Sequence, residues 1–148
     1  MQQIMTGVPA KKPSSQARAA TATVADVMQL PLTTVTRHDH AAAAAYLMKH
    51  AATTALIVVD AQTGQPAGII TETDIAHAIA DGKDVNDVRV DAVMATRPAV
   101  STTTSIRDAA TIMTARQFRH LPVASGAGLL GIADIVDLCR ALINAAEG

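Results

Sequence analysis

The sequence predicts an α+β fold in which two repeated β-α-β-β-α units pack sheet against sheet around a pseudo-two-fold axis. Residues 68–74 read as the end of a buried strand that runs directly into a helix, and residues 131–137 are an imperfect copy of them. Other matching residues, such as Met28 and Met94, keep nearly the same separation along the chain. Because a repeat of this length cannot bury a sheet that is apolar on both faces, the two units are expected to pack on each other.

Composition excludes several classes of protein. The chain has 148 residues, is 49% hydrophobic and carries a formal net charge of -1, which gives no general reason to expect binding to nucleic acid or to an anionic membrane. No segment approaches the ~18 consecutive apolar residues of a membrane span. The single cysteine, Cys139, excludes an internal disulfide and fits a reducing compartment. We therefore expect a cytoplasmic protein that contacts no membrane.

The first 22 residues differ from the rest of the chain. They contain Lys11, Lys12 and Arg18, lack acidic residues and include no continuous apolar block. This composition is typical of a disordered tail, and we expect residues 1–22 to form one. Contact of this tail with nucleic acid is an open but weaker alternative.

The first repeat is expected over residues 23–82. Its apolar, β-branched runs predict strands, and its periodic segments predict helices. Asp39 is expected to cap the second helix, and Gly82 to end the last one in a left-handed conformation. In chain order we expect a short helix over 24–28, a strand over 32–35, a helix over 41–50, strands over 55–59 and 67–70, and a helix over 72–80.

A polar segment over 83–89 is expected to link this repeat to a second one over 90–146, in which the same order recurs. Ser105 and Asp108 have the spacing of a capping box at a helix start. The matching segments are a helix over 90–94, an extended stretch over 98–100, a helix that begins after Ser105, strands over 121–124 and 129–133, and a helix over 135–146.

This doubled pattern resembles the cystathionine-beta-synthase (CBS) domain family. The residues that carry the resemblance are the Gly-hydrophobic-hydrophobic-Thr-x-x-Asp stretch that ends at Asp74 and the Arg-His-Leu-Pro-Val stretch over 119–123. Two such domains in tandem form what is often called a Bateman module. The resemblance covers roughly residues 24–143, and it implies a module that often binds AMP, ADP, ATP or S-adenosylmethionine between its sheets and often forms flat homodimers. It implies no required cofactor.

The resemblance implies that the motif aspartate holds ribose hydroxyls, that Thr71 contacts ribose or phosphate, and that basic residues reach the phosphates. The ligand contacts that it implies here are Thr71, Asp74, Thr33, Thr34, Ile70, Arg119, His120 and Asp137. A carboxylate can clamp a cis-diol and a helix N-terminus suits a phosphate, so Asp74 and Thr71 fit these roles chemically. The same spacing is also a capping box, which would only stabilise the helix.

The two copies differ where a phosphate would bind. Asp134 stands in the second copy where Thr71 stands in the first, and its negative charge disfavours a phosphate there. Conversely, the first copy has Thr54 and Ala55 where the second has Arg119 and His120. We therefore expect one site built on Thr71 and Asp74 and a weak or degenerate second one, which either takes a nucleoside-like or cationic ligand, with Asp137 on a ribose, or stays empty. The sequence leaves open which cleft Arg119 and His120 face, or whether they form a solvated strand end.

No residue set indicates catalysis or a metal centre. The chain has no nucleophile elbow, no phosphate-binding P-loop and no base near its cysteine, and its five histidines do not have the spacing of zinc ligands. We therefore expect a non-enzymatic regulatory module that binds an adenosine-containing ligand and acts through its dimer geometry or an unknown protein partner. The alternative is a ligand-free dimerisation scaffold whose motif residues only cap helices.

Overall fold

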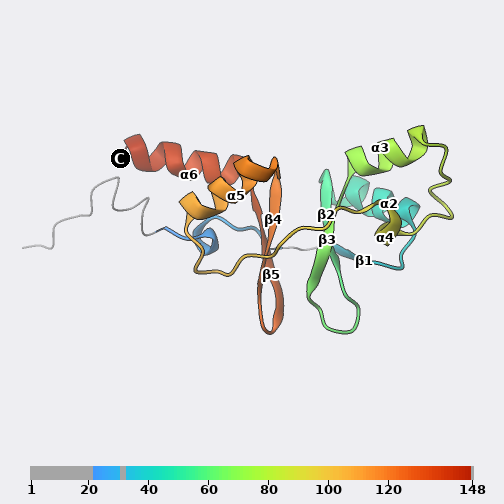
Figure 1. Cartoon of the computed structure of the whole chain (residues 1–148), viewed down its shortest axis with the longest axis horizontal. Helices are drawn as coiled ribbons and strands as arrows, with labels where there is room; N and C mark the ends of the chain where they lie inside the picture. The colour runs from blue at the N-terminus through green and yellow to red at the C-terminus, as the bar shows by residue number, and fades with distance from the viewer. Residues whose placement is uncertain (1–21, 31–32, 148) are drawn as a thin grey trace, which may run out of the picture.

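The computed structural model describes residues 22–30 and 33–147, so the predicted disordered tail lies outside the described residues except for Ala22. The element order largely follows the prediction (Figure 1). The elements are η1 (Val24–Asp26), β1 (Thr34–Thr36), α2 (Ala41–Ala51), β2 (Ala55–Val59), β3 (Pro66–Thr71), α3 (Glu72–Ala80), α4 (Val90–Val93), α5 (Ile106–Arg116), β4 (His120–Ser125), β5 (Gly128–Asp134) and α6 (Ile135–Glu147).

Each repeat contains one small sheet. In the first, β1 is parallel to β2, and β2 is antiparallel to β3. The second consists of the antiparallel pair β4 and β5, to which Val100 adds a single parallel bridge at Val123. The extended stretch expected over 98–100 therefore corresponds to β1 but is reduced to one bridged residue.

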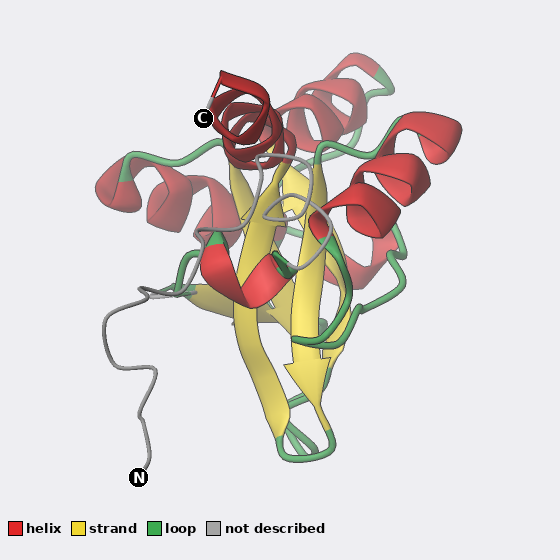
Figure 2. Cartoon of the chain, turned by 90° about the vertical axis from the view of Figure 1, so that its left-hand side faces the viewer, coloured by secondary structure: helices red, strands yellow, loops and turns green. Residues whose placement is uncertain are grey.

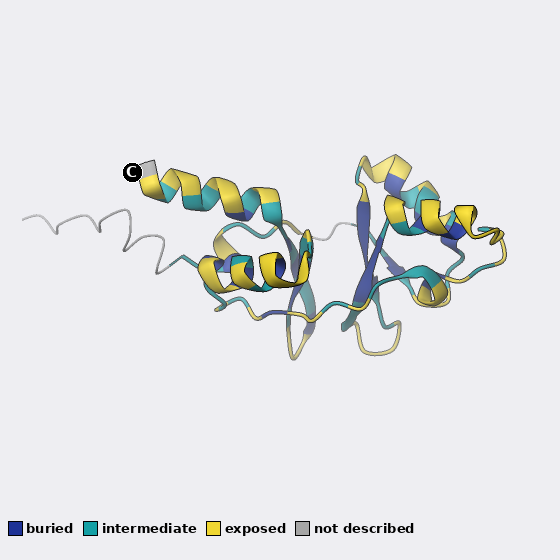
Figure 3. Ribbon diagram, turned by 45° about the horizontal axis from the view of Figure 1, so that its top comes forward, coloured by how far each residue is buried: buried dark blue, intermediate teal, exposed yellow. Residues whose placement is uncertain are grey.

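The two sheets face each other, as predicted, and the helices cover their outer faces (Figures 1 and 2). Ile57 and Ile69 of the first sheet pack with Leu129 and Ile132 of the second in a small apolar cluster between the sheets. Two larger clusters fill the space between each sheet and its own helices. The buried residues accordingly concentrate in the strands and on the inner sides of the helices (Figure 3).

The first short helix of each repeat packs on the other repeat. The N–H of Val24 in η1 donates to Thr104 O at 2.9 Å, and Val24 lies in the core of the second repeat. In the same way, Val90 N–H of α4 donates to Asp39 O at 2.8 Å, and Val90 lies in the core of the first repeat. The repeats thus exchange their leading helices, each of which packs on the core of the other repeat.

The repeated motif glycines lie where the exchanged segments cross the sheets. A side chain at Gly131 would place its Cβ 2.9 Å from Gln29 O, in the segment that follows η1. A Cβ at Gly68 would collide with Ala95 O, in the segment that follows α4. Since a backbone carbonyl cannot rotate away as a side chain can, both positions require glycine for close approach of two chains.

Helix caps agree with the sequence in most places and differ at one. Ser105 Oγ accepts from Asp108 N–H at 2.9 Å, and Gly82 has a φ of 82° at the end of α3, as predicted. The prediction that Asp39 caps α2 is wrong, because the N-cap residue is His40. Asp39 Oδ2 instead accepts from Thr36 N–H at 2.9 Å, which closes the turn between β1 and α2. An aspartate satisfies such a turn as readily as a helix end.

Candidate functional site

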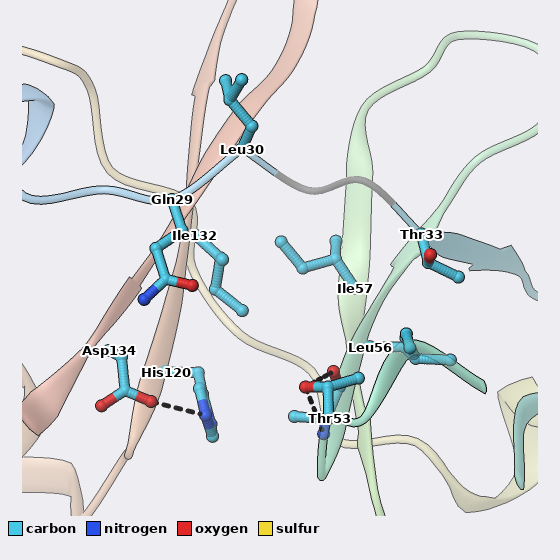
Figure 4. A pocket seen from close by; sticks show the side chains of 11 residues that line it. Gln29, Leu30, Thr33, Thr53, Leu56, Ile57, His120, Ile132 and Asp134 are labelled. Carbon is cyan, nitrogen blue, oxygen red and sulfur yellow. Dashed lines mark hydrogen bonds and ion pairs between the residues drawn. The ribbon is translucent and has the colours of Figure 1, made fainter. Parts of the chain in front are cut away.

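Two pockets lie along the seam between the repeats, and His120 lines both. The first, called the Thr71 pocket, has a volume of about 210 Å³. The second, called the Asp134 pocket, has a volume of about 340 Å³ and is drawn in Figure 4. The Thr71 pocket is lined by Thr54, Ile69, Thr71, Glu72, Thr73, Arg97, Gln117, Arg119 and His120. The Asp134 pocket is lined by Gln29, Leu30, Thr33, Ala51, Thr53, Ala55, Leu56, Ile57, His120, Ile132 and Asp134.

The Thr71 pocket brings together the hydroxyl of one repeat and the basic residues of the other. Thr71 is the N-cap of α3 in the first repeat, whereas Arg119 and His120 stand at the start of β4 in the second. On the question that the sequence left open, Arg119 lines the cleft that contains Thr71, and His120 lines both clefts. Glu72 is the acidic residue among the described lining residues of this pocket.

Sequence reasoning missed Arg97, which also lines the Thr71 pocket. Its guanidinium carbon lies 4.0 Å from the centroid of the Phe118 ring, a cation–π contact that holds the side chain beside the pocket. Arg97 follows α4, the helix that packs on the first repeat, and no motif marks it. The exchange of leading helices brings it to the pocket, and that exchange is not visible in the sequence.

Thr71 and Asp74 form a complete capping box. Thr71 Oγ1 accepts from Asp74 N–H at 3.1 Å, and Asp74 Oδ2 accepts from Thr71 N–H at 2.9 Å. The N–H of Glu72 donates to Thr54 O at 3.0 Å. The helix end therefore satisfies much of its own hydrogen-bonding capacity and offers a ligand fewer donors than an uncapped N-terminus would.

Asp74 lies beside the Thr71 pocket and is not among the residues that line it. Its Oδ2 accepts the hydrogen bond of the cap, while its Oδ1 makes no hydrogen bond within the described part of the chain. A carboxylate has two oxygens and about four acceptor positions. Capping thus leaves Asp74 with the capacity to accept from a hydroxyl group of a ligand.

Asp134 has a different environment from its counterpart Thr71. Its Oδ2 lies 3.1 Å from His120 Nε2 (Figure 4). Its Oδ1 accepts from Val136 N–H at 2.7 Å. The rest of the Asp134 pocket is largely apolar, with Leu30, Leu56, Ile57 and Ile132 among its lining residues. The carboxylate therefore caps α6 and binds the imidazole, and it gives this pocket a negative charge.

The protonation of His120 is set by its burial and its neighbours. Burial lowers the pKa of His120 below its ordinary value of 6.5, and the charges of Arg119 and Arg97 lower it further, while Asp134 raises it only in part. Burial disfavours the charged imidazolium because it removes water from around the charge. His120 is therefore mainly neutral near pH 7.

The remaining predicted ligand residues are dispersed. Asp137 accepts from Gln29 Nε2 at 2.7 Å and from Arg140 Nη1 at 3.2 Å, and it does not line the Asp134 pocket. Thr33 lies in the Asp134 pocket and not with Thr71, whereas Thr34 in β1 lines neither pocket. Ile70 is fully buried in the core of the first repeat. The structure therefore gathers Thr71, Arg119 and His120 in one pocket but separates the other predicted residues from it.

Neither a metal cluster nor a membrane helix is found in the described residues. Over 22–30 and 33–147, no group of three or more His, Cys, Asp or Glu side chains is placed to hold a metal ion. Within the same residues, no helix has both the length and the apolar character needed to cross a membrane.

Comparison with known proteins agrees with the geometry of the repeats. The family model of the CBS domain matches residues 24–81 and again residues 88–144. An uncharacterised 17.7 kDa protein of Acidianus ambivalens is 38% identical over 104 residues, which are 70% of this chain and 62% of that protein. The chain spans less than two thirds of the length of the curated relatives that it matches.

Solved structures share the fold. The hexameric CBS-CP12 protein from bloom-forming cyanobacteria superposes with a TM-score of 0.73 at 30% identity, covering 81% of this chain and 71% of that one. CBSX2, solved in complex with AMP, gives a TM-score of 0.70 at 24% identity and covers 84% and 98% of the two chains. With two matched domains in tandem and this architecture, the chain belongs to the CBS domain family.

Proposed function

We propose that this chain is a regulatory module that binds an adenosine-containing ligand with its phosphate in the Thr71 pocket. The observation that carries the proposal is the convergence of Thr71 from the first repeat with Arg119 from the second on one pocket. Arginine and hydroxyl groups at a helix N-terminus are the chemistry that recognises phosphate oxygens. Arg97 adds a second guanidinium, and its contact with Phe118 restrains its position.

The size of the pocket limits what it holds. Small-molecule sites typically have volumes of about 300–1,000 Å³. The Thr71 pocket, at about 210 Å³, accommodates only the phosphate-bearing part of a nucleotide. Asp74 lies nearly one helical turn after Thr71, and its Oδ1 has no hydrogen bond within the described residues, so it is the residue that we expect to accept from the ribose hydroxyls.

Such a ligand would act by joining the two repeats. Its phosphate would contact α3 of one repeat and the start of β4 of the other, so binding would favour the arrangement in which these elements are close. A ligand shifts a conformational equilibrium only by its difference in affinity for the two states. We propose that this shift is transmitted to a protein partner. The AMP complex of CBSX2 supports the proposal only through the shared fold.

A thermal-shift screen against AMP, ADP, ATP, S-adenosylmethionine and adenosine, with and without magnesium, tests the proposal. A ligand at one hundred times its dissociation constant adds about 2.7 kcal/mol of stability. We expect a nucleotide to raise the melting temperature and adenosine to raise it less, because adenosine lacks the phosphate. Asp74→Ala should reduce the response to every ligand, whereas Asp108→Ala, at the matching position of α5, should leave it unchanged.

The second candidate function is a ligand-free scaffold. It is favoured by the internal hydrogen bonds of Thr71, Asp74, Asp134 and Asp137, each of which already has a partner in the chain. Under this hypothesis, Asp74→Ala lowers stability and there is no ligand response to lose. Flat melting curves for all ligands, on protein first shown to carry no nucleotide, would favour the scaffold.

We also propose that the module self-associates through its outer helices. Val136 and Ile143 lie seven residues apart on α6 with exposures of 55% and 56%, so they share one helical face. Ile79 on α3 is 58% exposed. Apolar side chains that form a contiguous patch on an exposed helical face mark contact surfaces, whereas single exposed ones do not. A homodimer is the assembly that we expect.

A further inference from the structure

We infer that the Thr71 pocket takes up its anionic ligand together with one proton, which is carried by His120 while Asp134 holds the imidazole ring. This inference rests on the proposed function, since it concerns the same pocket, and it adds a coupling between ligand binding and pH. It also assigns a role to Asp134, which lines the Asp134 pocket but would affect ligand binding in the Thr71 pocket.

The geometry that carries the inference is the position of His120 between two pockets. His120 lines the Thr71 pocket and the Asp134 pocket alike. Its Nε2 lies 3.1 Å from Asp134 Oδ2, with side-chain exposures of only 18% and 32% for the two residues. An anion in the Thr71 pocket would therefore approach an imidazole that is already bound to a carboxylate on its other side.

The carboxylate determines which nitrogen of the neutral ring carries the hydrogen. An ionised carboxylate only accepts hydrogen bonds, so Nε2 must donate to Asp134. In the neutral ring Nδ1 then bears a lone pair, which repels an anion. Only the protonated ring has a second N–H group and a positive charge to offer the ligand. Neutral His120 thus hinders the anion, and protonated His120 attracts it.

The groups that surround His120 make protonation depend on the ligand. Arg119 and Arg97 lower the pKa of His120 and Asp134 raises it, while Glu72 lines the same pocket from the start of α3. A phosphate between the arginines would offset their positive charge and favour the imidazolium. Binding therefore takes up a proton, and by linkage the affinity for the anion rises as the pH falls.

Asp134 acts as a positioning residue in this scheme. From the sequence, we interpret Asp134 as a negative charge that disfavours phosphate in the second repeat's site. In the structure, it contacts His120, which also lines the Thr71 pocket. The first repeat has Thr71 at the equivalent position, so the carboxylate stands on only one side of the seam. Arg97 and Arg119 make the Thr71 pocket cationic, whereas Asp134 makes the other pocket anionic.

Calorimetric titration with ADP at pH 7, in two buffers that differ in ionisation enthalpy, measures the protons taken up. The wild type is compared with His120→Gln, because the terminal phosphate of ADP titrates identically in both. We expect the wild type to take up more protons on binding ADP than His120→Gln does. For each unit by which the pH is lowered, the affinity of the wild type for ADP should rise by up to about tenfold more than that of His120→Gln. Asp134→Asn should shift the pH profile to lower pH without abolishing binding in acid.

Two outcomes separate this inference from the proposed function. Equal proton uptake and parallel pH profiles for wild type and His120→Gln would overturn the inference while ADP binding itself stands. If ADP does not bind but sodium sulfate raises the pKa of His120, measured by NMR titration of the wild type, the nucleotide proposal fails and the inference stands. Absence of any response to either anion would overturn both.

Discussion

Thr71 and Asp74 exchange two hydrogen bonds across the first turn of α3. The backbone N–H of Thr71 donates to Asp74 Oδ2 at 2.9 Å, and the backbone N–H of Asp74 donates to Thr71 Oγ1 at 3.1 Å. The cap fixes the orientation of the two residues that the family motif assigns to ligand binding. Capping and ligand binding are therefore compatible, because the cap fixes these side chains and leaves one carboxylate oxygen of Asp74 without a recorded partner in the described chain.

The cap predicts a stability cost for Asp74→Ala. We expect the variant to lose about 1 kcal/mol of unfolding free energy, measured by urea denaturation, because the N–H of Thr71 loses its acceptor. Asp108→Ala is the matched control: Asp108 has the same position in α5, but within the described residues its side chain makes no hydrogen bond, and only its backbone N–H donates to Ser105 Oγ. We expect the control to lose less, about 0.3 kcal/mol, the lower end of the effect of one charge near a helix end, because Asp108 is exposed. A loss for Asp74→Ala no greater than that of the control would contradict this account of the cap.

Close approach of the exchanged segment predicts that Gly131→Ala is destabilising. The added methyl group would meet Gln29 O at 2.9 Å, so the segment after η1 must move away from β5. We expect a loss of about 1–3 kcal/mol in urea denaturation. Gly126→Ala is the control, since a Cβ there meets nothing within 4 Å. Similar stabilities for the two variants would show that the segment does not pack as described.

The environment of His120 predicts that stability depends on pH. Burial lowers the pKa of the folded-state imidazole below 6.5, so the unfolded chain binds more protons as the pH falls through that value. The stabilising contribution is complete above about pH 6.5 and decreases as the pH falls toward the folded-state pKa. We expect the wild type to lose more stability than His120→Gln between pH 7.5 and pH 5.5. Asp134→Asn should lose more still, since it removes the charge that supports the imidazolium.

Exposed apolar residues on α6 predict an effect of Ile143→Glu on assembly. The side chain of Ile143 is 56% exposed, so a charge at this position should leave the fold intact but prevent its burial in a homodimer interface. We expect light scattering after gel filtration to show a dimer for the wild type and a monomer for the variant. Asn144→Glu, at an exposed neighbour, is the control and should remain dimeric. A wild type that is monomeric at all concentrations would contradict the proposed assembly.

Much of the fold could be predicted from the sequence because its signals are local. The apolar run at Ala55–Val59 and the capping box at Thr71 each specify an element through residues that are adjacent or three apart. The exchange of leading helices could not be predicted, because Val24 and Val90 have equivalent local patterns whichever repeat they cover. The single bridge at Val100 could not be predicted either. Its sequence is extended like that of β1, and only the structure shows that it pairs at one residue, Val123, and forms no full strand.

The site was predictable only in part, for the same reason. The family motifs identify Thr71, Arg119 and His120, which the structure places in one pocket. Arg97 lies outside any motif and reaches the pocket through the path of the chain after α4. The resemblance implies Thr33 as a ligand contact, but the path of the chain between η1 and β1 places it in the Asp134 pocket and not with Thr71. Residue roles that depend on chain path require the structure.

The measurement that tests the central claim most directly is equilibrium binding of ADP to the wild type, Arg119→Ala and Arg116→Ala. Both arginines are exposed and both variants change the net charge equally, but only Arg119 lines the Thr71 pocket. If the phosphate binds between the two repeats, Arg119→Ala should weaken binding by about tenfold or more, as expected for loss of a charge-assisted hydrogen bond, and Arg116→Ala by less than about twofold. Equal affinities for the two variants, or no binding to the wild type, would contradict it.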